Sequence, residues 1–92
     1  MTPQGIKDAI AEMNPDALFA DGFENALIGY VSQFNRILAC YDLGACVRIL
    51  MKRDGMTEEE ASEFVEFNVT GSYVGENTPC FLTMVRAPWR TS

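Results

Sequence analysis

The beginning of the chain repeats apolar residues with the spacing of an α-helix. Four of them stand at positions i, i+3, i+4 and i+7, namely Ile6, Ala9, Ile10 and Met13. Such spacing places them on one face of a helix. Thr2 is a capping residue, Pro3 suits the first helical position, and Asn14-Pro15 is a stop signal. We therefore expect a helix between Thr2 and Asn14.

A different pattern follows, rich in β-branched and aromatic residues. A connector at 16–24, with room for a short helical turn, leads to the segments 26–34 and 37–41, which have the composition of strands. The short polar stretch from Gln33 to Arg36 predicts a hairpin turn between them. Because both segments are almost continuously apolar, we expect cover on both faces or an interface on one face.

Two further helices and a last strand complete the pattern. Asp42 can cap a helix that stops at Gly55, and Thr57 begins a capping box that opens a third helix ending near Thr70-Gly71. A third strand is expected at 80–85. The order α-β-β-α-α-β predicts an α+β fold, with a small antiparallel sheet of about three strands and helices packed on one face. Residues 1–92 form one predicted domain, with 86–92 as a flexible tail.

The aromatic residues are expected to lie mostly in the core. We place Phe64, Phe67 and Phe81 at its centre. The candidates for exposed anchor residues are Tyr30, Tyr73 and Trp89, since tyrosine and tryptophan are enriched at interface hot spots.

The net charge of −6 narrows the classes of partner. Free nucleic acid and anionic membranes are disfavoured, because binding to either depends on Lys and Arg. A basic protein surface, or a groove built for nucleic acid, is a better match. We find neither a signal peptide nor an apolar run near the roughly 20 residues that span a bilayer, and we expect a cytoplasmic location.

Catalytic chemistry has little support in the residue types. The chain has no histidine, its three cysteines are Cys40, Cys46 and Cys80, and no pair of them is spaced C-x-x-C. Histidine-based triads are thus ruled out, and phosphate-binding glycine loops are absent from the sequence. We predict a protein that is not an enzyme, with buried thiols and with no metal or cofactor.

The acidic residues are unevenly distributed. Seven acids lie between Asp54 and Glu76, with no Lys or Arg among them. Such an acidic surface is typical of a protein that docks on a basic groove, although solubility alone would explain it equally well. A second cluster precedes the hairpin, where Asp21-Gly22 also has the composition of a simple turn. The partner-binding candidates are Asp21, Glu24, Glu59, Glu63, Glu66, Glu76 and Asn77.

Three stretches carry a family resemblance. They are Asp21-Gly22-Phe23-x-x-Ala26-x-x-Gly29, Asp54-Gly55-Met56-Thr57-x-Glu59-x-Ala61, and Phe64-x-x-Phe67-Asn68-Val69-x-Gly71-x-Tyr73-Val74-Gly75-Glu76-x-Thr78-Pro79. Together they resemble a group of small phage and prophage proteins of unassigned activity. Small size and acidity also resemble the anti-CRISPR class, a type I-F member in particular.

The resemblance implies a phage-encoded inhibitor acting in the host cytoplasm. Its partner would be the type I-F CRISPR-Cas surveillance complex of Cas proteins and crRNA, and its effect would be to block target DNA binding. Two alternatives stay open: an accessory interaction protein that works as a homodimer through the apolar hairpin, and a small-molecule or nucleotide-binding module. The chain itself is expected to be a monomer or a homodimer.

Overall fold

The structure, a computed structural model, describes residues 2–70 and 75–85. Its elements in chain order are α1 (Pro3–Met13), the 3-10 turn η1 (Glu24–Ala26), β1 (Leu27–Gln33), β2 (Arg36–Asp42), α2 (Leu43–Asp54), α3 (Glu58–Val65), the π-helical turn η2 (Glu66–Thr70) and β3 (Cys80–Leu82). The predicted α+β class and the order α-β-β-α-α-β are confirmed, as is the short turn in the connector. The predicted flexible tail lies outside the described residues.

The capping signals correctly placed the starts of the three helices and the ends of α1 and α2, whereas the third helix, predicted to end near Thr70-Gly71, is α-helical only to Val65 and continues as the π-helical turn η2. The Thr2 hydroxyl and the Asp42 carboxylate accept hydrogen bonds from backbone N–H groups in the first turns of α1 and α2. Gly55 ends α2 in the left-handed conformation, with φ of 68°, which only glycine adopts without strain. Thr57 and Glu60 form the complete capping box of α3, with distances of 3.1 and 2.9 Å.

The hairpin turns over two residues. β1 pairs with β2 in antiparallel register, and the pair Gln33–Arg36 closes the turn. Phe34 and Asn35 have φ of 49° and 63°. Two successive left-handed residues make a type I′ turn, whose twist matches that of the strands. A bulge at Ile28 interrupts the register near the start of β1.

The direction of the third strand differs from the prediction of an antiparallel sheet. β3 pairs with β2 in parallel, with Cys80 beside Cys40 and Leu82 beside Asp42, so the sheet is mixed and its order is β1-β2-β3. A parallel neighbour requires a long crossover connection, and α2 with α3 supplies it. The strand is also shorter than predicted, because it ends at Leu82 rather than continuing to Val85.

The core lies between the sheet and the helices, but two predicted members are not in it. Its largest fully buried side chains are Ile10, Tyr41, Cys46, Leu50 and Val65. The expectation that Phe64 and Phe67 occupy the core centre is wrong, since they are 37% and 74% exposed. The buried stripe of α3 consists of Ala61 and Val65, four residues apart, and both phenylalanines lie beside that stripe.

The third expected aromatic residue does reach the core. The ring of Phe81 packs against the buried cluster and stacks on Tyr41. Of the predicted exposed anchors, Tyr30 is 50% exposed, as expected. Tyr73 and Trp89 lie outside the described residues.

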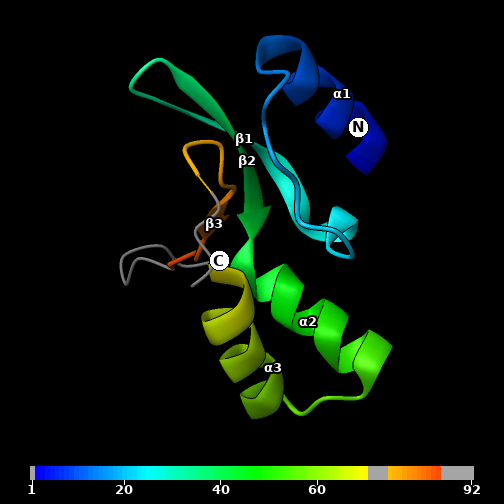
Figure 1. The fold of residues 1–92 in the computed structure, drawn as a ribbon. Helices are drawn as coiled ribbons and strands as arrows, with labels where there is room; N and C mark the ends of the chain where they lie inside the picture. Colours follow the sequence, from blue (N-terminus) through cyan, green and yellow to red (C-terminus); the bar gives the residue numbers. More distant parts are fainter. Residues whose placement is uncertain (1, 71–74, 86–92) are drawn as a thin grey trace.

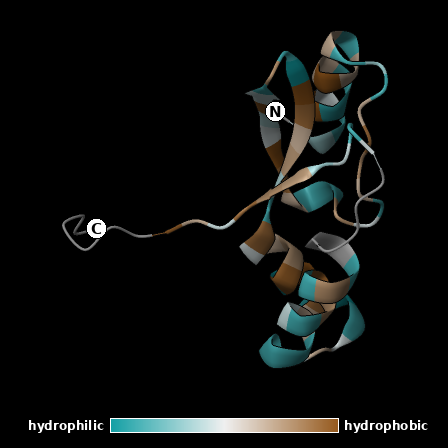
Figure 2. Cartoon of the chain, turned by 60° about the vertical axis from the view of Figure 1, so that its left-hand side comes forward, coloured by the Kyte–Doolittle hydropathy of each residue, from teal (hydrophilic) through white to brown (hydrophobic). Residues whose placement is uncertain are grey.

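The molecule has two ends (Figure 1). At one end α1 lies beside the β1–β2 hairpin; at the other, α2 and α3 form a helical pair beyond the end of β2. The outward surface of this helical pair is largely hydrophilic (Figure 2). The arrangement follows from the short connection at Asp42, where β2 passes directly into α2.

Candidate protein-docking site

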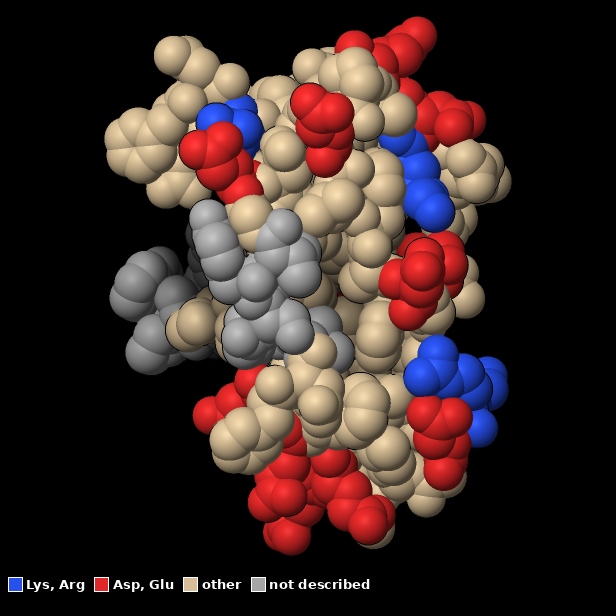
Figure 3. Space-filling model, in the orientation of Figure 1, with Lys and Arg blue, Asp and Glu red and all other residues tan. Residues whose placement is uncertain are grey.

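A row of carboxylates follows the solvent-facing side of α3 and continues into η2. Glu59, Glu63 and Glu66 stand at i, i+4 and i+7, and all three are exposed. They lie across the helix from the buried stripe of Ala61 and Val65, because residues four apart share a helix face. In Figure 3 acidic side chains gather at the lower end of the molecule, over α3. We call Glu59, Glu63 and Glu66 the acidic face.

Two carboxylates of this face, those of Glu59 and Glu63, form no ion pair with another described residue. The ion pairs in the described part of the chain are Arg36–Glu76, Arg48–Asp42 and Arg53–Asp54. None of these pairs involves Glu59 or Glu63. Like charges four residues apart on a helix repel by about 0.2–0.5 kcal/mol. A basic partner would remove this repulsion.

Glu60 belongs to the same helix but has a structural role. Its carboxylate accepts a hydrogen bond from the Thr57 backbone N–H, and this bond lowers the pKa of Glu60. Glu58 lies on the side of α3 that faces α2, where it lines a groove between the two helices. Glu59 and Glu63 therefore face solvent away from α2, whereas Glu66, at the end of the acidic face, also borders the groove between the two helices.

Apolar grooves flank α3 on both sides. One has a volume of about 300 Å³ and is lined by Met56, Glu60, Glu63, Phe64, Phe67 and Asn68. The other follows the contact between α2 and α3 in two sections of about 540 and 360 Å³, which share Val47 and Ser62. The first groove is shallow and combines aromatic rings with carboxylates, which suits a protein surface better than an enclosed small molecule.

Phe67 is the exposed anchor that sequence reasoning missed. It is 74% exposed beside the acidic face, and exposed aromatic rings are common sources of binding energy at interfaces. The helical pattern gave no clear signal for this, because Phe64 stands three residues after Ala61 and therefore also fits the spacing of a buried stripe.

The other acidic candidates, Asp21 and Glu24, lie at a turn of the connector that contacts α2. Asp21 is exposed, and Gly22 has φ of +89°. Backbone N–H groups of Glu24 and Gly22 hydrogen-bond the Glu24 carboxylate and lower its pKa. Arg53 donates a hydrogen bond to the Gly22 carbonyl at 3.1 Å, and its guanidinium lies 5.6 Å from the centre of the Phe23 ring. Asp21 and Glu24 are thus separate from the acidic face, and Glu24 lies within the influence of the Lys7 and Arg53 charges.

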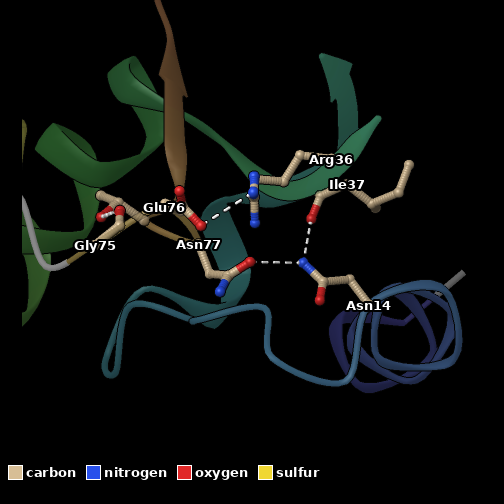
Figure 4. Close-up of polar contacts among 7 residues, drawn as sticks. Asn14, Arg36, Ile37, Gly75, Glu76 and Asn77 are labelled. Carbon is tan, nitrogen blue, oxygen red and sulfur yellow. Dashed lines mark hydrogen bonds and ion pairs between the residues drawn. The ribbon is translucent and has the colours of Figure 1, made fainter. Parts of the chain in front are cut away.

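The last two candidates have structural partners at the hairpin end of the molecule (Figure 4). Glu76 forms an ion pair with Arg36 at 3.0 Å. The side-chain oxygen of Asn77 accepts a hydrogen bond from the Asn14 amide at 3.0 Å, and the same amide donates to the Ile37 carbonyl at 2.8 Å. These contacts connect α1, β2 and the turn before β3. The seven predicted residues therefore fall into three places, and only Glu59, Glu63 and Glu66 form one surface.

The cysteines are free thiols; Cys40 and Cys46 are buried as predicted, whereas Cys80 is only partly buried. Cys46 is fully buried, and burial raises its pKa to about 11. Burial, together with the neighbouring Cys80, also raises the pKa of Cys40. Thiolates are the reactive form, so the fully buried Cys46 is poorly reactive near neutral pH. Within residues 2–70 and 75–85 we find no cluster of His, Cys, Asp and Glu that could hold a metal ion.

The helices give no sign of a membrane span. Among the described residues, none of the helices has both the length and the apolar character that crossing a bilayer requires.

Comparisons with protein-family models, with curated proteins and with solved structures found no match to this chain. The function must therefore be argued from the site itself.

Proposed function

We propose that this protein acts without catalysis, by docking the acidic face of α3 on a basic protein surface of the kind that holds nucleic acid. The observation that carries the proposal is the position of Phe67, an exposed aromatic ring that shares a groove with Glu63, on a helix surface where Glu59 and Glu63 have no ion-pair partner among the described residues. A surface that served solubility alone would need charge but no exposed ring.

The charges and the ring would contribute differently to docking. Carboxylates along one helix face steer a basic partner during encounter and speed association at low salt. An aromatic ring beside a shallow groove becomes buried in the complex and slows dissociation. The groove lined by Met56, Phe64 and Phe67 supplies the apolar centre, with Glu60 and Glu63 at its border. The combination resembles an interface core with a polar rim.

The resemblance to small phage proteins suggests the first partner to test. A type I-F surveillance complex holds its crRNA and target DNA with basic residues, so an acidic helix could occupy the place of the DNA backbone. In this proposal the protein is a phage-encoded inhibitor, and target DNA and the acidic face compete for the same Lys and Arg residues.

The test is a pull-down of the purified surveillance complex on the immobilised protein at low and high salt. We expect capture at low salt, weaker capture at high salt, and competition by target DNA. The double variant Glu59→Lys/Glu63→Lys should lose capture. Absence of capture by the wild-type protein at low salt would exclude this complex as the partner.

A matched control separates the acidic face from net charge. Asp8 and Glu12 are exposed on α1 and also stand four residues apart. The double variant Asp8→Lys/Glu12→Lys changes the net charge by the same amount as Glu59→Lys/Glu63→Lys. It should keep binding. Equal loss in both double variants would show that overall charge, rather than α3, determines docking.

A further inference from the structure

The outer edge of β1 is an open binding edge. The strand order β1-β2-β3 places β1 at one side of the sheet. In the described part of the chain, the hydrogen bonds outside helices and strands leave Leu27–Gln33 untouched except at Leu27, where η1 ends. An unpaired edge exposes N–H and C=O groups that can pair with another strand.

The edge also lacks the features that prevent such pairing. β1 is seven residues long, Leu-Ile-Gly-Tyr-Val-Ser-Gln, with neither a charge nor a proline. Its bulge at Ile28 affects only the first residues. Ile28 and Tyr30 are about half exposed, at 49% and 50%. Proteins usually protect an edge with lysine, proline or a very short strand, and β3, at the other side of the sheet, is short in this way.

The register of the hairpin determines which backbone groups point outward. In a two-residue hairpin the closing pair, here Gln33 and Arg36, exchanges hydrogen bonds across the strands. Backbone groups then alternate along β1, so those of Val31 point toward β2, and those of Tyr30 and Ser32 point away from it. Tyr30 and Ser32 therefore offer two donors and two acceptors to a new strand.

We propose that β1 of a second copy of this chain pairs with this edge in antiparallel orientation, centred on Val31. In that register Tyr30 of each copy exchanges hydrogen bonds with Ser32 of the other, and the two-fold axis makes the pairing self-complementary. The register favours a second copy as the occupant, because the outward groups of Tyr30 and Ser32 then pair with the same groups of the other copy. Two chains that each carry a net charge of −6 repel each other, but β1 itself carries no charge, so the repulsion is weakest along this strand.

Phe34 supplies an independent observation. Its ring is 91% exposed, and its backbone has φ of 49°. Turn positions of this kind favour Asn, Asp or Gly, and a strained, exposed residue is a sign of function. In the register centred on Val31, the turn residue Phe34 of one copy follows the paired strand on the side where Ile28 of the other copy begins it. The dimer would therefore bring an exposed ring near an exposed aliphatic side chain at both ends of the strand pair.

The dimer does not depend on the docking function of α3. The hairpin and the α2–α3 pair lie at opposite ends of the molecule (Figure 1), so pairing through β1 leaves both acidic faces accessible. A dimer would display two docking surfaces and could bind a repetitive partner with avidity. A variant that fails to dimerise should therefore still dock, and a variant that fails to dock should still dimerise.

The first test is sedimentation velocity over a range of concentrations, on the full chain and on two variants at one position. Ser32→Pro removes an outward N–H without removing a hydrogen bond to β2. Ser32→Ala keeps that N–H. We expect the wild type and Ser32→Ala to dimerise as concentration rises, and Ser32→Pro to stay monomeric with an unchanged circular dichroism spectrum. A wild type that is monomeric at every concentration would overturn the proposal.

The second test examines the register by cross-linking. Val31 faces its own copy across the axis in a pair without hydrogen bonds, where Cα atoms are about 4.5 Å apart, within the range of a disulfide. Diamide, which takes up the two hydrogens of a thiol pair, should link Val31→Cys chains into covalent dimers. Gln33→Cys chains should stay unlinked, because their cysteines would lie about 13 Å apart along the strands. Equal linking of both variants, or linking of Gln33→Cys alone, would contradict the register.

Discussion

The ring of Tyr41 stacks on the ring of Phe81, with centroids 5.5 Å apart and an angle of 24° between the planes. Tyr41 and Phe81 are register neighbours in the parallel pair β2–β3. The Tyr41 hydroxyl also accepts a hydrogen bond from the Ala20 backbone N–H at 2.8 Å. One side chain, 1% exposed, thereby connects β2, the last strand and the connector after α1.

Replacing Tyr41 by phenylalanine tests the polar part of this arrangement. Tyr41→Phe keeps the stacked ring and leaves the part-buried Ala20 N–H without its acceptor, a loss that typically costs about 1–3 kcal/mol. For a domain of this size each kcal/mol lowers the melting temperature by about 4–8 °C. Thermal unfolding with a urea titration measures both quantities. Tyr30→Phe, at a half-exposed site, is the matched control and should change stability by less than about 0.5 kcal/mol.

Local signals accounted for the starts of the helices, whereas long-range packing did not follow from the pattern. The caps at Thr2, Asp42 and Thr57 depend on residues within one helical turn, and all are formed. The parallel direction of β3 depends on how α2 and α3 return the chain to β2, which no short motif encodes. For the same reason, an α+β class was predictable and the mixed sheet was not.

The residues of the candidate site also differ in how far local sequence signals could place them. Helical periodicity places Glu59, Glu63 and Glu66 on one face without any tertiary information. Glu76 and Asn77 are close to them in sequence, but their partners, Arg36 and Asn14, come from the other half of the chain. Charge counting along the sequence could not distinguish an open carboxylate from one with a partner so distant in the chain.

The neighbouring thiols of the parallel pair provide a test of the β3 register. Cys40 and Cys80 are partners in adjacent strands, which lie about 4.8 Å apart, close enough for a disulfide. Diamide should convert these two thiols to a disulfide, with the two hydrogens passing to the reagent. Cys46, fully buried and with its pKa raised to about 11, should remain reduced. Peptide mapping identifies the linked pair, and a Cys46-containing disulfide would contradict the register.

The capping box makes the free energy of unfolding depend on pH. The hydrogen bond from the Thr57 N–H lowers the pKa of Glu60 in the folded chain below its ordinary value of 4.5. Between the two pKa values the unfolded chain binds more protons, so the free energy of unfolding falls as pH falls through that window and is regained above it. Glu24, whose pKa is also lowered by backbone N–H groups, should add to the same slope.

Glutamine at position 60 isolates this contribution. Glu60→Gln can still complete a capping box but does not titrate. We expect it to show a shallower loss of stability than the wild type between about pH 5 and pH 3, measured by urea titration at each pH. The remaining slope should decrease further when Glu24→Gln is added. An unchanged slope in Glu60→Gln would mean that its carboxylate does not contribute through this bond.

The two parts of the α3 surface should leave different kinetic signatures on a partner that it captures. Glu59→Lys/Glu63→Lys should lower the association rate and flatten its salt dependence, because these carboxylates act during encounter. Phe67→Ala should leave association nearly unchanged and raise the dissociation rate by about tenfold or more, as expected for loss of a hot-spot ring worth at least about 1.4 kcal/mol. Phe34→Ala removes a still more exposed ring, at the hairpin tip, and is the matched control. Surface plasmon resonance at several salt concentrations resolves both rates. A dissociation rate that responds to Phe34→Ala and not to Phe67→Ala would place the partner on the hairpin instead of α3.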